Sequence, residues 1–251
     1  FIGDVTPRVS DIMVSDVHHV RSTATCAHAL KLMDDRNVRT LPVLNEDKIV
    51  EGIVTIFQLG EFFIPKSGDS LSMRRVHTSI SAIIEALDAK VINLIDPDRV
   101  DEYFVRVGAM DIRSFGKFIN NKSTPPNRSI IVVGDRWDIQ QKAIQMGVRL
   151  IVISGDLQID PEVLEMAEER GVSVILSPYD TASISWLIRT ATKLEPMVIR
   201  DVFKFGPEEK LSVVRRKLAS HPAVSFMVVD EDDRLLGVFS KTDLIKPVDT
   251  K

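Results

Sequence analysis

The sequence predicts a mixed α/β protein, in which two copies of a helix, strand, strand, helix unit stand on either side of a separate α/β segment. Residues 41–59 match residues 226–244 without a gap, and short apolar runs alternate with helical segments between these copies. Internal similarity at a fixed spacing indicates a repeated structural unit. Strands that alternate with helices are typical of a parallel sheet covered by helices. We therefore expect a mostly parallel sheet between the two copies.

Each copy of the repeat contains a predicted β-hairpin. Residues 41–47 and 226–232 both run from an apolar strand into an acidic turn, and a second apolar stretch follows at 52–55 and 237–240. Apolar runs bounded by turn residues are typical of paired strands. Ahead of each hairpin, apolar side chains recur at the spacing of an amphipathic helix. They are Cys26, Ala29 and Met33 in the first copy and Leu211, Val214 and Leu218 in the second.

The segment between the copies predicts further strands at residues 130–133, 150–153 and 172–176. Asp160 is placed to cap the helix that follows the second of these strands, with Pro161 in its first turn. Another strand is expected at 89–95, followed by a helix after Asp98.

Length and composition narrow the classes of protein to which the chain can belong. Its 251 residues exceed a single small module, because domains hold roughly 100–200 residues. The net charge of −4, without a long block of one sign, argues against a nucleic-acid partner. No apolar run approaches the roughly 18 residues that span a bilayer, so no membrane partner is expected. The chain begins at Phe1 rather than Met, and we expect it to be a piece of a longer protein.

The cysteine content indicates a reducing compartment. Cys26 is the only cysteine, so an intrachain disulfide and a cysteine-based metal cluster are both excluded. We therefore expect a cytoplasmic protein. Cys26 itself falls on the apolar stripe of a helix, where a small core residue is the expected reading.

A hydroxyl, a cation and a carboxylate lie close together where the second hairpin leads into a helix: Ser240, Lys241 and Asp243. A helix N-terminus offers N–H groups to phosphate, and a carboxylate can accept hydrogen bonds from both hydroxyls of a ribose. The same Ser-x-x-Asp spacing is also a plain capping arrangement. The first copy carries Thr55 at the hydroxyl position but Gln58 at the carboxylate position, and a neutral amide lacks the charge assistance of a carboxylate.

The repeated order of apolar strand, acidic turn, glycine, two apolar residues and a hydroxyl resembles a pair of CBS domains. Residues 131–136, 147–148 and 177–181 resemble a DRTGG domain, although the five-letter motif of that name does not occur. The order CBS, DRTGG, CBS, with the opening residues 1–5 and 9–13, resembles the regulatory insert of CBS-containing family II inorganic pyrophosphatases. On this resemblance the domains are expected at 1–62, 63–195 and 196–251.

The resemblance implies a regulatory region that senses adenine nucleotides and has no catalytic residues of its own. AMP or ADP would inhibit, and ATP or diadenosine polyphosphates would activate, an attached pyrophosphatase whose manganese or cobalt belongs to catalytic domains outside this sequence. A homodimer through the CBS domains is implied as well, and the apolar helical stripes that end at Met33 and Leu218 fit it.

The same resemblance assigns site residues. Asp243 would hold the ribose, and Ser240 with Lys241 the phosphate. Thr55 and Gln58 would be their counterparts in the first copy. Arg39 and Thr40, directly before the first strand of the first hairpin, would lie near the cleft and meet phosphate or base.

Two other functions remain open. One is an α/β enzyme with its site in the middle segment, which shows no nucleophile beside a base and no Gly-x-Gly-x-x-Gly after Gly134. The other is a nucleotide-sensing module of another CBS or DRTGG protein, such as a transcription regulator. His18 and His19 are adjacent and have no third ligand at metal-binding spacing, so no metal site is expected in this chain.

Overall fold

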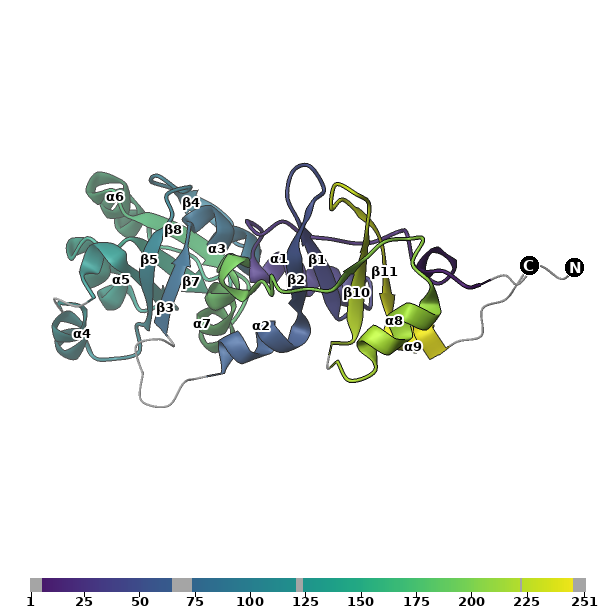
Figure 1. Ribbon diagram of the computed structural model, residues 1–251. Helices are drawn as coiled ribbons and strands as arrows, with labels where there is room; N and C mark the ends of the chain where they lie inside the picture. Colours follow the sequence, from purple (N-terminus) through teal and green to yellow (C-terminus); the bar gives the residue numbers. More distant parts are fainter. Residues whose placement is uncertain (1–5, 65–73, 121–123, 222, 246–251) are drawn as a thin grey trace, which may run out of the picture. The chain divides into compact units, whose positions relative to one another are not determined.

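The structure is a computed structural model that describes residues 6–64, 74–120, 124–221 and 223–245. The chain divides into two compact units. Unit 1 is Phe1–Ala24, Ala29–Gly60 and Leu194–Lys251, and unit 2 is Thr25–His28 and Glu61–Lys193. Figure 1 gives the order of their elements. Both predicted hairpins belong to unit 1, and the predicted parallel strands belong to unit 2.

Two antiparallel hairpins with the same register form the centre of unit 1. Their strands are β1 (Thr40–Leu44) with β2 (Val50–Thr55), and β10 (Ser225–Val229) with β11 (Leu235–Ser240). Thr40 is opposite Thr55, and Ser225 is opposite Ser240. Each hairpin also has a register shift at the turn end of its first strand. The predicted repeat is therefore confirmed in its strand pairing.

The acidic turn of each hairpin is closed by its first polar side chain. Asn45 Oδ1 accepts hydrogen bonds from the N–H groups of Asp47 and Ile49, at 3.0 and 2.9 Å. Asp230 makes the corresponding bonds in the second copy, both at 2.9 Å. Asn and Asp favour turns because their side chains can bond to the main chain a few residues on.

The segment ahead of each copy pairs with the hairpin of the other copy. Val14 bridges to β11, and Ile199 bridges to β2. A glycine lies beside each crossing: a Cβ at Gly52 would be 2.3 Å from the Ile199 carbonyl oxygen, and one at Gly237 would be 2.9 Å from the Val14 carbonyl oxygen. Both distances are shorter than any real Cβ contact, so the close approach of main chain requires glycine at each position.

Helices precede and follow the two hairpins: α1 (Cys26–Asp35), α2 (Ile56–Phe63), α8 (Leu211–Leu218) and α9 (Lys241–Ile245). Short elements are η1 (Val9–Asp11), η4 (Glu195–Met197) and β9 (Lys204–Phe205), of which β9 pairs parallel with β10. The predicted apolar stripes of α1 and α8 are buried, as expected. Met227 and Val229 of the second hairpin share an apolar cluster with Leu44, Val50 and Ile53 of the first.

Unit 2 is built on a six-stranded sheet in the order β3-β5-β6-β7-β8-β4. The four central strands are parallel, and the two outer strands are antiparallel to their neighbours, so the predicted mostly parallel sheet is confirmed. The strands are β3 (Arg75–Thr78), β4 (Lys90–Asn93), β5 (Asp101–Val107), β6 (Ser129–Val133), β7 (Leu150–Ser154) and β8 (Ser173–Ser177).

Helices cover both faces of this sheet. One face packs α3 (Ile80–Leu87) and α7 (Thr181–Thr190). The other packs α4 (Ile112–Ile119), α5 (Trp137–Gln145) and α6 (Pro161–Arg170). Ile130 and Val132 point to the first face, whereas Ile131 and Val133 point to the second. A strand buried on both sides needs no polar alternation, which is why residues 130–133 form an unbroken apolar run.

Capping residues and glycines predict where helices begin and end in unit 2, but one helix was predicted where a strand lies. Asp160 caps α6 as predicted, accepting the Glu162 N–H at 2.8 Å, and Gly171 ends that helix with a φ of 65°. The helix predicted after Asp98 is wrong, because β5 begins there at Asp101. Residues 103–105 are an aromatic and β-branched run that is buried in the sheet, and this favours a strand over a helix.

Candidate functional site

A pocket of 220 Å³ in unit 1 receives residues from both hairpins and from the segment before α1. Its apolar wall is Val14, Val17, Val38, Pro42, Met227, Val238 and Phe239. Its polar groups are Asp16, His18, Thr40, Ser225, Ser240 and Asp243. The pocket therefore combines apolar surface with hydroxyls and carboxylates, as small-molecule sites do.

Three of the seven predicted site residues line this pocket: Thr40, Ser240 and Asp243. Thr40 starts β1, and Ser240 ends β11, so the two come from different copies of the repeat. Arg39, Thr55, Gln58 and Lys241 are not among the lining residues.

Ser240 and Asp243 form a reciprocal cap at the start of α9. Asp243 Oδ2 accepts the Ser240 N–H at 2.9 Å and the Ser240 hydroxyl at 2.6 Å, while the Asp243 N–H donates to Ser240 Oγ at 3.4 Å. This is the capping box that the Ser-x-x-Asp spacing allowed. The cap holds the carboxylate in one orientation at the pocket.

Thr55 and Gln58 form the equivalent cap of α2. The Thr55 hydroxyl donates to Gln58 Oε1, and the Gln58 N–H donates to Thr55 Oγ1 at 3.3 Å. The two copies thus share the local geometry but differ in charge, since only the second ends in a carboxylate.

Lys241 and Arg39 lie elsewhere on unit 1. The Lys241 ammonium donates to the His221 carbonyl, and its side chain lines a separate open hollow with Arg215 and Leu244. Arg39 is exposed, and its carbonyl accepts the Ile56 N–H at 3.0 Å.

Sequence reasoning missed several pocket residues, among them Asp16, His18 and Ser225. Ser225 could have been found, because it precedes the second repeat as Thr40 precedes the first. Asp16 and His18 could not, because they reach the pocket through the pairing of Val14 with β11, which no local pattern predicts. The sequence analysis considered His18 only as a metal ligand, so it did not predict that this residue lines the pocket.

The lining suggests which part of a ligand could bind. The apolar side chains can contact a flat ring, and the hydroxyls and carboxylates can hydrogen-bond a sugar. Among the described lining residues there are two carboxylates and no Lys or Arg, so a phosphate group would find little favourable charge inside the pocket.

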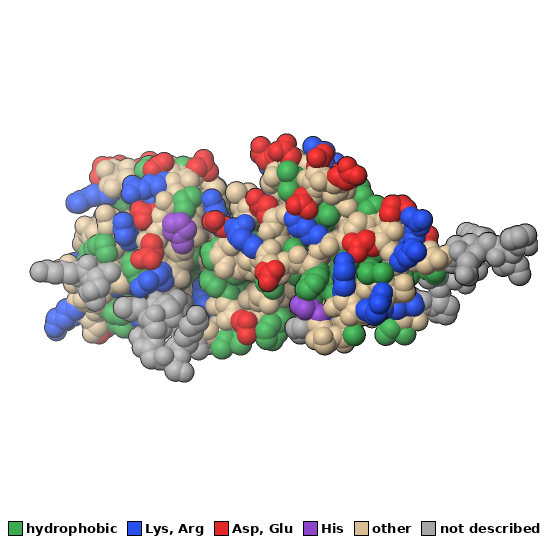
Figure 2. Space-filling view, in the orientation of Figure 1, with side chains coloured by type: hydrophobic (Ala, Val, Ile, Leu, Met, Phe, Trp, Pro, Cys, Tyr) green, Lys and Arg blue, Asp and Glu red, His purple; other side chains and the backbone are tan. Residues whose placement is uncertain are grey.

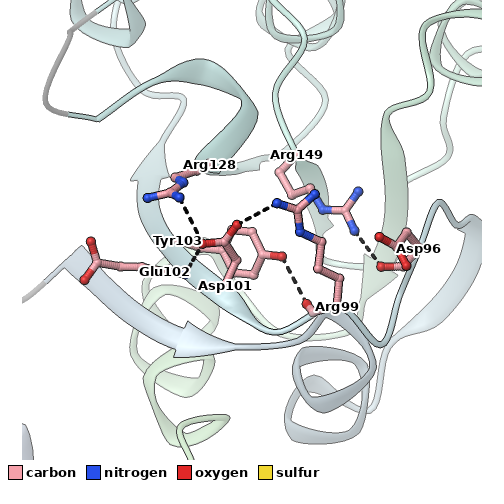
Figure 3. A network of polar contacts seen from close by, with 7 residues as sticks. All are labelled: Asp96, Arg99, Asp101, Glu102, Tyr103, Arg128 and Arg149. Atoms are coloured by element: carbon pink, nitrogen blue, oxygen red, sulfur yellow. Dashed lines mark hydrogen bonds and ion pairs between the residues drawn. The ribbon is translucent and has the colours of Figure 1, made fainter.

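Unit 2 has a polar network at the start of β5 (Figure 3). Asp101 accepts the Glu102 N–H at 2.8 Å and pairs with Arg99 at 3.1 Å and with Arg128 at 3.4 Å. The Glu102 N–H, followed by the Arg128 and Arg99 charges, holds the pKa of Asp101 below its ordinary value against the opposing effect of burial. Asp101 is therefore ionised at neutral pH and bound by its neighbours, which suits a structural role better than acid–base chemistry.

The described residues contain no group of three or more His, Cys, Asp or Glu side chains that could hold a metal ion. Burial raises the pKa of the Cys26 thiol to about 12, so this thiol stays protonated at neutral pH. In the part of the chain that the structure covers, no helix is long and apolar enough to span a membrane. The face drawn in Figure 2 carries acidic and basic side chains interspersed.

Comparison with known families identifies the domains. The DRTGG domain family matches residues 82–191, and the CBS domain family matches residues 9–59 and 194–249. The chain contains two CBS domains and a DRTGG domain. The pocket with Ser240 and Asp243 accordingly belongs to the CBS pair, and the Asp101 network belongs to the DRTGG domain.

Two curated relatives match almost the whole length of this chain. The chain is 22% identical over 246 residues to a cobalt-dependent inorganic pyrophosphatase of Clostridium perfringens, a match that covers 98% of this chain and 44% of the relative. It is 21% identical over 260 residues to a probable manganese-dependent inorganic pyrophosphatase of Thermotoga maritima, covering 100% of this chain and 44% of the relative. The chain thus spans less than half the length of either pyrophosphatase.

A solved structure has the same fold. It contains the CBS and DRTGG domains of the regulatory region of Clostridium perfringens pyrophosphatase, complexed with the activator diadenosine tetraphosphate. The match has a TM-score of 0.76 at 22% identity and covers 94% of this chain and 100% of that one. The CBS, DRTGG, CBS arrangement expected from the sequence is therefore confirmed.

Proposed function

We propose that this chain is the adenine-nucleotide-sensing regulatory region of an inorganic pyrophosphatase. The observation that carries the proposal is the fold match, with a TM-score of 0.76, to a pyrophosphatase regulatory region complexed with diadenosine tetraphosphate. In this proposal AMP and ADP inhibit the attached enzyme, whereas ATP or diadenosine polyphosphates activate it. Catalytic domains outside this sequence carry the manganese or cobalt, in a cytoplasmic protein. The proposed domain boundaries are 1–62, 63–195 and 196–251.

The pocket of the CBS pair is the proposed nucleoside site. Asp243 accepts hydrogen bonds from the ribose, with Ser240, Ser225 and Thr40 as further hydroxyl partners. At 220 Å³ the pocket is smaller than the roughly 300–1,000 Å³ of typical ligand pockets, so we place the nucleoside inside and the phosphates at its mouth. Lys241 could reach a phosphate only by leaving the His221 carbonyl.

The first CBS domain supplies a weaker counterpart in the same proposal. Thr55 and Gln58 occupy the positions of Ser240 and Asp243 in the repeat. Arg39, which is exposed and directly precedes the first strand of this hairpin, is the candidate phosphate partner. An amide has one acceptor oxygen where a carboxylate has two, so a ribose diol is held less firmly by Gln58.

The proposal includes a homodimer, although not through the helical stripes expected from the sequence. Met33 and Leu218 are buried within the chain itself, so they cannot form the outer face of a dimer. Phe57 on α2 and Ile245 on α9 are 65% and 82% exposed, and the proposal places these two apolar side chains at the dimer surface. Light scattering should give twice the monomer mass at tens of micromolar protein, and a monomer with and without AMP would refute the dimer.

Calorimetric titration of the chain tests the ligand class. AMP, ATP and diadenosine tetraphosphate should bind with micromolar affinity or better, whereas GMP and S-adenosylmethionine should bind far more weakly. The chain alone should release no phosphate from pyrophosphate in the presence of Mn²⁺ or Mg²⁺. Absence of heat with every adenine nucleotide, or hydrolysis of pyrophosphate by the chain, would contradict the proposal.

A further inference from the structure

A hollow of 630 Å³ lies between α4 and α5 of unit 2, apart from the nucleotide pocket. Its charged lining is Arg113 and Lys117 from α4 and Lys142 from α5. Two amide side chains, Asn120 and Gln145, complete its polar surface. The hollow is therefore lined by cations and hydrogen-bond donors from both helices.

The cations that line this hollow lack a carboxylate partner among the described residues. None of its described lining residues is acidic, and no ion pair among the described residues involves Arg113, Lys117 or Lys142. Other cations of unit 2 do have carboxylate partners, such as Arg128 with Asp101 at 3.4 Å. Three like charges around one space repel each other, so a bound anion would lower their energy.

The spacing of the residues brings the donors together. Arg113 and Lys117 are four residues apart, which places them on the same face of α4. Gly116 lies beside them in the hollow, where a Cβ would be 3.5 Å from Lys142 Cε. Glycine is disfavoured in a helix interior, and here the missing side chain leaves room between the two helices.

We propose that this basic hollow binds an inorganic oligophosphate, of the size of pyrophosphate or tripolyphosphate. Guanidinium and ammonium groups supply several donors each to phosphate oxygens. Ile112 is the one large apolar residue in the described lining, and none of that lining is aromatic, so the lining offers no aromatic face to a nucleobase. The hollow thus recognises the phosphate chain itself, and it does so independently of the function proposed for the CBS pair.

Titration of the whole chain with tripolyphosphate at low ionic strength tests the proposal. The double variant Lys117→Gln/Lys142→Gln should bind tripolyphosphate at least roughly 10-fold more weakly, because each exposed charge contact contributes up to severalfold in affinity. The control is Lys90→Gln/Arg170→Gln, which removes the same charge from exposed positions of unit 2 outside the hollow. This control should bind within about twofold of the parent.

A second variant tests the basic hollow by adding a negative charge to it. Gly116→Glu introduces a carboxylate between the cations and a better helix former, so the variant should fold and lose tripolyphosphate binding. AMP binding by the CBS pair should be unchanged in all three variants, which separates this proposal from the nucleotide site. ATP should bind the hollow no better than tripolyphosphate. No binding by the parent, or equal weakening in the control variant, would overturn the proposal.

Discussion

Asp243 Oδ2 accepts two hydrogen bonds from Ser240, one from its N–H at 2.9 Å and one from its hydroxyl at 2.6 Å. This contact makes the residue proposed to hold the ribose also a member of the reciprocal cap of α9. A carboxylate has about four lone-pair sites, so capping and ligand binding can use the same group. The cap would then serve the site by fixing the orientation of the carboxylate before the ligand arrives.

Asp243→Ala should weaken AMP binding about 30- to 100-fold, because it removes charge-assisted hydrogen bonds to the ribose. Gln58→Ala should cost several-fold less, because it removes a neutral group from the equivalent position. Calorimetric titration measures both. Ser240→Ala breaks the same cap, which contributes about 1 kcal/mol to stability, and removes one hydroxyl partner but keeps the carboxylate, so it should weaken AMP binding less than Asp243→Ala does. AMP affinity equal to that of the parent in Asp243→Ala would show that the site belongs to other residues.

Ser225→Phe should block nucleotide binding although it leaves Asp243 itself unchanged. Ser225 is directly opposite Ser240 in the hairpin, so both side chains lie on the same face of the strands. A phenyl ring there would fill much of the 220 Å³ pocket, while Phe remains a favourable strand residue. Circular dichroism should report an unchanged fold, and AMP titration should show a loss of at least roughly 10-fold. A variant that keeps the parent affinity would place the nucleotide outside this pocket.

Arg106→Met should destabilise unit 2 by about 2–4 kcal/mol. Arg106 is only 4% exposed, lies 4.7 Å from the centre of the Phe118 ring, and donates to the Phe118 and Thr124 carbonyls. Met preserves much of the volume but leaves these carbonyls without their donor.

Urea unfolding followed by tryptophan fluorescence measures this loss. Both tryptophans, Trp137 and Trp186, belong to unit 2, so the signal reports on that unit. Arg170→Met, at an exposed position of α6, is the control and should change stability by less than about 0.5 kcal/mol. Equal stability of Arg106→Met and the parent would show that the buried guanidinium is dispensable.

Asp101→Asn should make unit 2 less stable at neutral pH but not in acid. The pKa of Asp101 is lowered in the folded state, so the unfolded chain takes up this proton first as the pH falls. The stabilisation is therefore present above about pH 4, the ordinary range for Asp, and is lost as the pH falls through the lower folded-state value. We expect a difference of about 1 kcal/mol between parent and variant at pH 7, which shrinks below about pH 4. Urea unfolding at a series of pH values measures it, and a constant difference would contradict the assignment.

The strands that are buried on both faces of the sheet could be predicted from their unbroken apolar sequence. Residues 130–133 and 150–153 are unbroken apolar runs because both faces of the parallel sheet are covered, and both are strands. The helix expected after Asp98 was wrong, because the aromatic and β-branched run of residues 103–105 is buried in the sheet and favours a strand. Local patterns decide such cases only when no stronger tertiary preference competes.

The candidate site was harder to predict than the fold. Thr40 lines the pocket but Arg39 does not, and neighbouring residues at the start of a strand point in different directions. His18 reaches the pocket because the chain ahead of the first copy pairs with the hairpin of the second. Such an exchange between copies is a long-range feature, and Gly52 and Gly237 take on their meaning only once the structure shows the main chain that crosses beside them.

Competition calorimetry between diadenosine tetraphosphate and AMP tests the central claim most directly. The chain is predicted to bind diadenosine tetraphosphate with micromolar affinity or better, to release it when AMP is added, and to lose most of the affinity for both in Asp243→Ala. Binding that AMP does not displace, or that Asp243→Ala leaves unchanged, would contradict a nucleotide site in the pocket of the CBS pair.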